Sequence, residues 1–394
     1  MSGREEAARL PALDGIRGLA ILFVALFHFT ALVGPETDRW LDEAFLKLTS
    51  AGWAGVDLFF VLSGFLITGI LCNAKDVARN YFRNFYARRT LRIFPAYYGF
   101  LALLALVLPL VQPMEDIATE AVRDRLLWYS TYLTNVNLGG DPLYHGDFFL
   151  TSHLWSLAAE EQFYLVWPAA VLLFGRRSLM AICVIVIIAA LGVRIGLDAA
   201  DAGRYIAHRI TPARMDTLAV GALIALAVRD RRDLDRLRVA AWPAALIASG
   251  ALLAIFFTRE RFSPFDGWVQ TAGYTSLAFV FGAFLLAGFA STPGTPLHAA
   301  LSVRPLRFLG KYSYALYLVH WPAASLLARR TDFFDFVPLV AGSGLLREAT
   351  FIAAAGALSI AIAWLSWQVW ESQWLKLKTH FPYWRPQPAA SLSS

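Results

Sequence analysis

Two ionisable side chains, Arg17 and His28, lie in the first apolar segment of the sequence, LDGIRGLAILFVALFH. They are eleven positions apart, about three helical turns, so both should lie on one helix face about 16 Å apart. Ionisable residues inside a membrane segment are costly and usually functional. A guanidinium group can bind an anion, and an imidazole can act as a general base. The spacing predicts one cavity with two chemically different ends. Alternatively, Arg17 reaches the lipid headgroups and His28 bonds a neighbouring carbonyl.

Four more ionisable residues are expected at the membrane depth of His28, in three later apolar segments. They are Asp57 in GVDLFF, Glu160 in SLAAEEQF, and Arg214 and Asp216 in ARMDTL. A histidine beside a carboxylate can act as a general base, because the carboxylate fixes the imidazole tautomer. Alternatively, an arginine and a carboxylate form a buried pair that only fixes helix packing. The sequence shows no serine or cysteine nucleophile motif and no metal-ligand spacing, so we expect no metal.

A second group of residues is basic and aromatic and is expected at the cytoplasmic boundary. The segment FYARRTLRIFPAYY contains Arg88, Arg89 and Arg92, and GKYSYALYLVHWP contains Lys311, Tyr312 and Ser313. Guanidinium groups bind phosphate in bidentate geometry, and aromatic rings can stack on a base. This group therefore predicts a phosphate site. The alternative is the ordinary excess of basic residues in the cytoplasmic loops of membrane proteins.

The segments that position these residues belong to a polytopic membrane protein. Of 394 residues, 58% are hydrophobic and only 16% are charged, a composition that soluble domains rarely show. Apolar runs long enough to cross a hydrocarbon core of about 30 Å lie near residues 13–33, 52–72, 93–112, 154–174, 179–197, 211–228, 239–257, 268–290, 312–330 and 349–370. The sequence therefore predicts an all-α fold of about ten transmembrane helices.

The distribution of charge predicts how this fold is oriented. Basic residues are concentrated in alternate loops, which places both termini in the cytoplasm. The same bias accounts for the net charge of +6, so no nucleic-acid partner is implied. No linker interrupts the spans, and we expect one domain over residues 1–378 and a disordered tail over residues 379–394. The first span shows no small-residue cleavage site and should stay in the mature protein.

The sequence resembles the acyltransferase-3 family of integral membrane proteins over nearly its whole length. The resemblance rests on five motifs in the expected order: R-x10-H formed by Arg17 and His28, GVDLFFVLSGFLIT, ARRTLRIFPAYY, HLWSLAAEEQFYLVWP and GKYSYALYLVHWP. It implies that an enzyme of the bacterial inner membrane transfers an acyl group, usually acetyl from acetyl-CoA, to a hydroxyl of a carbohydrate or envelope glycan. Some relatives acylate macrolides instead. Because the chain ends soon after its tenth span, we expect it to complete the transfer alone, and a homo-oligomer is compatible with it.

The resemblance also implies roles for the ionisable residues. Arg17 and the basic residues at the cytoplasmic boundary would bind the acyl-CoA donor, whose pantetheine arm would extend toward His28. His28 would be the general base toward the acceptor hydroxyl, oriented by Asp57 or Glu160, and Arg214 would stabilise the oxyanion. Transfer through a transiently acetylated His28 is compatible with the same residues.

Acceptor contacts are expected on the outer side, where the segment 113–153 is long and aromatic. Aromatic rings and amides suit sugar rings, although the aromatic residues could equally form an interfacial belt. The residues that we assign to the acceptor are Trp128, Asn135, Tyr144, Glu161, Asp216 and His320.

Two other protein classes compete with this interpretation. A proton-coupled transporter would use intramembrane His, Asp, Glu and Arg residues as a relay. However, the sequence shows no inverted repeat and no pair of broken helices, and a proton path does not require the basic R-x-x-R motif. A structural scaffold would explain the spans but not the ionisable residues.

Overall fold

The protein is a bundle of helices in a computed structural model that describes residues 3–33, 39–75, 80–106, 126–136, 150–228, 231–259, 261–328 and 336–383. Within these ranges the named elements are all helical, and no β-strand occurs. The long helices are α1 (Gly3–Val33), α3 (Gly55–Lys75), α4 (Tyr81–Leu106), α8 (Trp155–Leu173), α9 (Arg176–Ala199), α11 (Thr211–Ala227), α12 (Arg231–Thr258), α13 (Tyr274–Ala290), α15 (Arg304–Ala328) and α16 (Leu345–Ser366). Shorter elements are α2 (Trp40–Thr49), η1 (Ser50–Ala54), α7 (Leu126–Ser130), η4 (Ser152–Leu154), α10 (Arg204–Arg209), η5 (Val269–Gly273), α14 (Pro296–Leu301), η7 (Trp367–Glu371), α17 (Ser372–Lys376) and η8 (Leu377–His380).

Each of the ten predicted spans falls on one of the long helices, which confirms the all-α prediction. Seven helical segments of the described chain are long and apolar enough to cross a membrane. Helices α4, α8 and α15 are not among these seven, and they carry many of the polar residues described below. The count of ten spans and the cytoplasmic location of both termini remain predictions.

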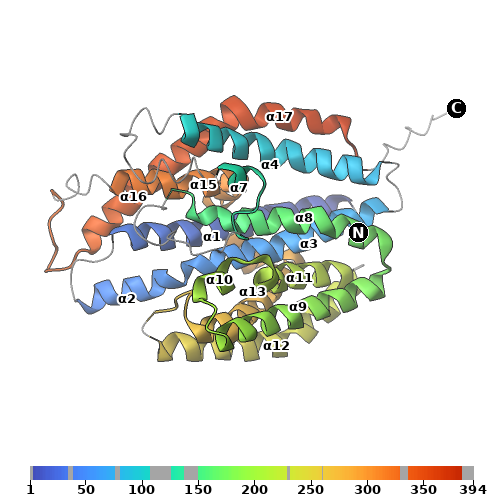
Figure 1. Ribbon diagram of the computed structural model, residues 1–394, viewed down its shortest axis with the longest axis horizontal. Coiled ribbons are helices and arrows are strands. Elements are labelled where there is room, and N and C mark those ends of the chain that lie inside the picture. Colours follow the sequence, from blue (N-terminus) through green and yellow to red (C-terminus); the bar gives the residue numbers. More distant parts are fainter. Residues whose placement is uncertain are drawn as a thin grey trace.

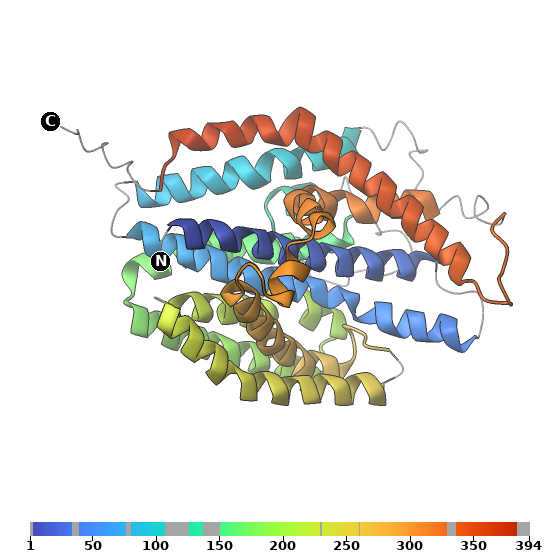
Figure 2. The same ribbon diagram turned by 180° about the vertical axis from the view of Figure 1, so that it is seen from behind.

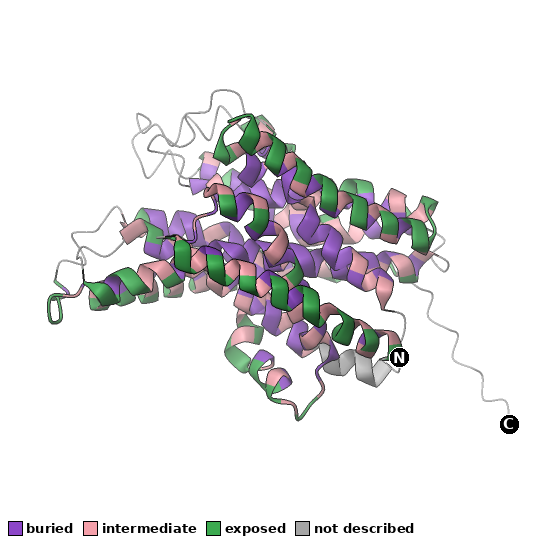
Figure 3. Ribbon diagram, turned by 90° about the horizontal axis from the view of Figure 1, so that it is seen from below, coloured by how far each residue is buried: buried purple, intermediate pink, exposed green. Residues whose placement is uncertain are grey.

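The helices are arranged around a central group of three. Figure 1 shows α1, α3 and α8 in the middle, α4 and α17 along one side, and α9 and α12 along the other, and the view from behind in Figure 2 agrees. Buried residues concentrate in the central helices, while the outer helices carry most of the exposed residues (Figure 3). Large apolar side chains on α12, such as Ile247 and Phe257, are about three-quarters exposed, as expected for a surface in contact with lipid.

Glycine residues allow the central helices to approach each other closely. A Cβ atom on Gly310 of α15 would lie 1.9 Å from the carbonyl oxygen of Asp14 in α1, and a Cβ on Gly18 would lie 1.9 Å from that of Leu306. Small residues at such contacts are typical of helix pairs in membranes. The close contact of α1 with α15 brings the Arg17–His28 face of α1 against α15.

Basic side chains mark one end of the bundle. Lys75, at the end of α3, donates hydrogen bonds to the carbonyl oxygens of Val171 (2.8 Å), in the last turn of α8, and of Phe174 (3.0 Å), directly after α8. Arg176, at the start of α9, donates to the carbonyl of Ala227 at the end of α11. We call this side of the bundle the basic end.

Candidate active site

A cavity of about 370 Å³ lies between α1, α3, α4, α8 and α15. Residues of α3 line it from Val56 to Ile70, a length of about 21 Å along the helix axis. Ile70 is on the side of the basic end, and Val56 is on the opposite side. Side chains such as Phe59 and Leu66 make the wall between them apolar.

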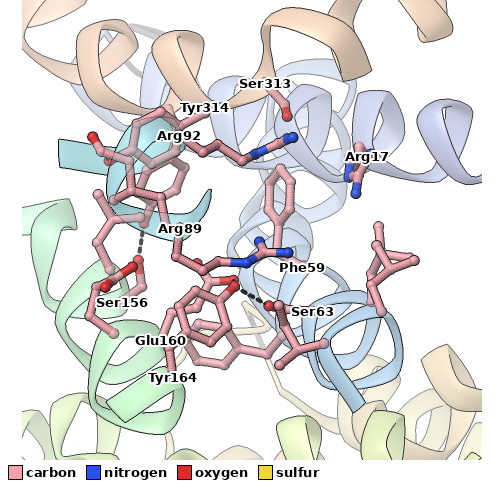
Figure 4. Close-up of a pocket in the computed structure, with 18 of the residues that line it drawn as sticks. Arg17, Phe59, Ser63, Arg89, Arg92, Ser156, Glu160, Tyr164, Ser313 and Tyr314 are labelled. Atoms are coloured by element: carbon pink, nitrogen blue, oxygen red, sulfur yellow. Dashed lines mark hydrogen bonds between the residues drawn. The ribbon is translucent and has the colours of Figure 1, made fainter. Parts of the chain in front are cut away.

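The part of the cavity toward the basic end is strongly cationic. Arg17 from α1, Arg88, Arg89 and Arg92 from α4, and Lys378 from η8 all line it. Figure 4 shows the guanidinium groups of Arg89 and Arg92 turned into the cavity, with Arg17 on the facing helix. Within the described ranges Arg89 and Arg92 form no ion pair, and Nε of Arg89 is buried without a hydrogen-bond partner. The geometry therefore brings together the four arginines assigned to the donor, and their charge suits a polyanion.

Glu160 and Glu161 add two carboxyl groups to the same cavity. The hydroxyl of Tyr164 donates a hydrogen bond to Oε1 of Glu160, and Ser63 donates to the Tyr164 oxygen (Figure 4). The Arg89 guanidinium lies 5.5 Å from the centre of the Tyr164 ring. The predicted contact of Glu160 with His28 is therefore wrong, because α8 turns Glu160 toward α3 and the cationic part of the cavity.

The opposite part of the cavity ends at two hydroxyl groups, those of Ser156 and Tyr317. Their oxygen atoms are 2.5 Å apart, and the Tyr317 hydroxyl donates to the backbone carbonyl of His153 at 2.9 Å. The Tyr317 ring lies 5.6 Å from the His320 ring and 5.4 Å from the His153 ring, between centroids. The cavity thus ends against a cluster of histidines.

His28 belongs to this cluster through a direct contact with His320. Nδ1 of His28 lies 2.8 Å from Nε2 of His320, and the other ring nitrogen of His320, Nδ1, lies 2.9 Å from the carbonyl oxygen of Tyr317. A carbonyl oxygen only accepts hydrogen bonds, so Nδ1 of a neutral His320 carries the proton and its Nε2 is an acceptor. His28 then donates from Nδ1, and its Nε2 holds a lone pair.

This lone pair gives His28 the form of a general base. Nε2 of His28 has no hydrogen-bond partner among the described residues, and the side chain is only partly buried. The sequence assigned the orienting role to a carboxylate, whereas the structure places a second histidine there. His320, assigned to the acceptor, instead contacts the proposed base.

The other ionisable residues that were expected at the membrane depth of His28 take part in two buried ion pairs. Neither pair belongs to the cavity lining. Arg214 pairs with Asp57 at 2.7 Å, and Arg194, which the sequence analysis missed, pairs with Asp216 at 2.8 Å. All four side chains are at most 1% exposed. The prediction that Asp57 orients His28 is wrong, because α3 turns Asp57 toward α11. The alternative of a pair that fixes helix packing agrees with this geometry.

We expect Asp57→Asn to destabilise the protein. The substitution leaves Arg214 buried without its counter-charge, which typically lowers the free energy of unfolding by about 3–5 kcal/mol. Thermal unfolding in detergent measures the effect, with Asp198→Asn on the exposed end of α9 as control. An unchanged melting temperature would show that the Asp57–Arg214 pair does not hold α3 to α11.

Of the other residues assigned to the donor or the acceptor, some line the cavity and some do not. Ser313 lines the cavity, whereas Lys311 and Tyr312 are not among the lining residues and pack with Trp367. Nδ2 of Asn135 donates to the Thr211 hydroxyl at 2.7 Å. Asn135 is completely buried, so the structure does not support its assignment to the acceptor.

Two further acceptor assignments, Trp128 and Tyr144, remain predictions, as does the expected absence of a metal. Trp128 lies in α7 and is half-buried, and Tyr144 lies outside the described residues. Among the residues described, no three His, Cys, Asp or Glu side chains are grouped as ligands for a metal ion. Metal-free chemistry remains a prediction.

The sequence analysis missed His153, Tyr317 and Lys378 as residues of this region. His153 opens the HLWSLAAEEQ motif, and Tyr317 lies within GKYSYALYLVHWP. Both residues could therefore have been selected as candidates, because they belong to motifs on which the family resemblance rests. Lys378 follows the last predicted span, and no sequence pattern indicated its place in the cavity.

Comparisons with known proteins point to one family. A family model described as an acyltransferase domain matches residues 10–368. The O-acetyltransferase OatA of Staphylococcus aureus is 29% identical over 331 residues, which cover 79% of this chain and 50% of that protein. The putative peptidoglycan O-acetyltransferase YrhL of Bacillus subtilis is 30% identical over 335 residues (80% and 49%), and the peptidoglycan O-acetyltransferase OatA of Listeria monocytogenes is 28% identical over 332 residues (80% and 50%). The chain thus spans about half the length of these curated relatives. No solved structure matches it.

Proposed function

Because the chain belongs to the acyltransferase family whose domain model matches residues 10–368, we propose that it is a membrane O-acetyltransferase of the bacterial inner membrane. Its donor would be acetyl-CoA and its acceptor a hydroxyl group of a cell-envelope glycan. The observation that carries this proposal is the cavity, which has cationic side chains at one end and closes at the other against Ser156 and Tyr317, with the histidine cluster directly behind Tyr317 rather than in the lining. The names of the relatives support O-acetylation and make peptidoglycan the first acceptor to test.

The cavity has the chemistry that an acyl-CoA would need. The phosphate groups of coenzyme A would bind the arginines of the basic end, because guanidinium groups pair with phosphate oxygens. The apolar wall formed by residues such as Phe59 and Leu66 would surround the pantetheine arm. An extended arm along the cavity length of about 21 Å would bring the thioester to the end at Ser156 and Tyr317.

In the proposed reaction, Nε2 of His28 takes the proton of the acceptor hydroxyl as its oxygen attacks the thioester carbonyl carbon. The carbon–oxygen bond forms, the carbon–sulfur bond breaks, and the thiolate of coenzyme A takes the proton from the His28 imidazolium. His320 accepts the Nδ1 hydrogen bond of His28 and so keeps the productive tautomer. The hydroxyl groups of Ser156 and Tyr317 line this end of the cavity, and one of them would exchange its present hydrogen bond for one to the developing oxyanion, a role that the sequence analysis gave to Arg214.

Donor binding tests the proposal without knowledge of the acceptor. Acetyl-CoA at about 100 times its dissociation constant should stabilise the purified protein by about 2.7 kcal/mol, seen as a higher melting temperature in detergent. Inorganic pyrophosphate at the same concentration is the control for non-specific anion binding. If saturating acetyl-CoA leaves the melting temperature unchanged, the proposal fails and a proton-coupled transporter becomes the better interpretation of the buried ionisable groups.

A further inference from the structure

The segment that follows the matched family domain packs against the donor cavity. We call residues 372–383 the C-terminal strap, which consists of α17, η8 and the three residues after η8. The family model ends at residue 368, so the strap lies outside the matched region. Figure 1 shows α17 running along α4.

Arg88 and Asn84 hold the strap on α4. Nη1 of Arg88 donates hydrogen bonds to the backbone carbonyl oxygens of Lys378 (2.9 Å) and Phe381 (3.1 Å). Nδ2 of Asn84 donates to the carbonyl oxygen of Pro382 at 2.6 Å. Nη1 of Arg88 is thus occupied in positioning the strap. Arg88 therefore has a structural role in addition to its predicted role in donor binding.

Two strap side chains, Lys378 and Tyr383, line the cavity together with Arg88. The Arg88 guanidinium lies 4.7 Å from the centre of the Tyr383 ring, which places an aromatic face at the cavity wall. Tyr383 is only partly buried, as is Lys378. The strap therefore adds a cation and an aromatic ring to the end of the cavity that is farthest from the histidines.

Glu160 and Glu161 line the same cavity, but among the described residues neither forms an ion pair with Arg88, Arg89, Arg92 or Lys378. Lys378 lies within electrostatic range of Arg88, Arg89 and Arg92. Among the described residues Lys378 forms no ion pair, and the three arginines repel its charge. Clustered cations that share one partly buried site are stabilised when an anion binds among them.

On the proposed function, we infer that the C-terminal strap forms the phosphoadenosine end of the donor site. Lys378 binds the 3′-phosphate of coenzyme A as a point charge, and Tyr383 stacks on the adenine ring. Arg89, Arg92 and Arg17, deeper in the cavity, are then left for the diphosphate. The strap makes the enzyme discriminate coenzyme A from analogues without the 3′-phosphate.

The test compares the affinities of purified protein for acetyl-CoA and for acetyl-dephospho-CoA, which lacks only the 3′-phosphate. The wild type should bind acetyl-CoA about tenfold or more tightly than the dephospho analogue, the size of one charge-assisted contact. Lys378→Met should reduce this ratio to about one without weakening the dephospho analogue, and Lys378→Arg should retain it. Tyr383→Ala should weaken both donors alike.

Lys376→Met is the matched control, because Lys376 is in the same strap, is exposed and bonds Gln373. If the wild type binds both donors equally, or if Lys378→Met keeps the ratio, the strap inference is wrong while the proposed function stands. If the wild type binds neither donor, the proposed function fails and the inference fails with it. The melting temperature of each variant without ligand shows that a change in affinity does not come from unfolding.

Discussion

Replacing His28 by glutamine should reduce acetyl transfer by about 10²–10⁴-fold, the usual contribution of a general base. Glutamine cannot take a proton from the acceptor hydroxyl, but it preserves much of the side-chain volume and can still donate a hydrogen bond toward His320. The affinity for acetyl-CoA should therefore stay within a few-fold of wild type. Transfer is measured as ester-linked label on a glycan acceptor, and donor affinity is measured on the same preparation.

The same account predicts a different result for His320. His320→Phe removes the acceptor of the Nδ1 hydrogen bond and leaves Nε2 of His28 free to carry the proton instead. We expect a smaller loss of transfer than in His28→Gln. His298→Gln, a buried histidine in α14 outside the cavity lining, is the control and should keep wild-type transfer. Wild-type transfer by His28→Gln would contradict the assignment of the base.

The second large effect is expected at the basic end. The double substitution Arg89→Gln and Arg92→Gln should weaken acetyl-CoA binding by about 10²–10⁴-fold, because each guanidinium–phosphate contact contributes about 1.5–3 kcal/mol. The turnover of bound donor should change less, because neither residue lies in the histidine cluster. Isothermal titration or thermal stabilisation by acetyl-CoA measures the loss.

The control for this pair is Arg177→Gln, an exposed arginine at the start of α9 that does not line the cavity. If basic residues act only through the general charge of the basic end, this variant should weaken binding as much as a single substitution of Arg89 or Arg92. A loss in Arg177→Gln equal to the loss in either single variant, Arg89→Gln or Arg92→Gln, would therefore show that the cavity arginines are not donor ligands.

Helix periodicity made part of the candidate site predictable. Arg17 and His28 share a helix face for geometric reasons that do not depend on the rest of the chain. In the structure that face meets α15, with Arg17 in the cavity and His28 bonded to His320. The sequence also grouped Arg89 with Arg92, and in the structure both line the cavity, whereas the anion site that they predict remains a prediction.

The pairing between helices was not predictable in the same way. Membrane depth placed Asp57 and Arg214 at the level of His28, but depth says nothing about the rotation of each helix. In the structure, the rotation of α3 and α11 joins Asp57 to Arg214, and the contact of α1 with α15 supplies His320, which is 292 residues from His28.

The C-terminal strap shows a second reason why part of the site could not be predicted from the sequence. Residues 379–383, which the sequence assigned to a disordered tail, contact α4 through backbone carbonyl oxygens that any sequence would provide. Such contacts leave no signature in hydropathy or charge pattern. A prediction from residue types alone therefore could not place Lys378 beside the arginines.

The central claim is that one cavity carries an acetyl group from a donor at the basic end to an acceptor at the histidine end. Its most direct test uses proteoliposomes that enclose labelled acetyl-CoA, with a soluble peptidoglycan fragment added only outside. The account predicts ester-linked label on the external glycan for the wild type and almost none for His28→Gln. External glycan that stays unlabelled, while glycan enclosed together with acetyl-CoA becomes labelled, would contradict transfer through the cavity.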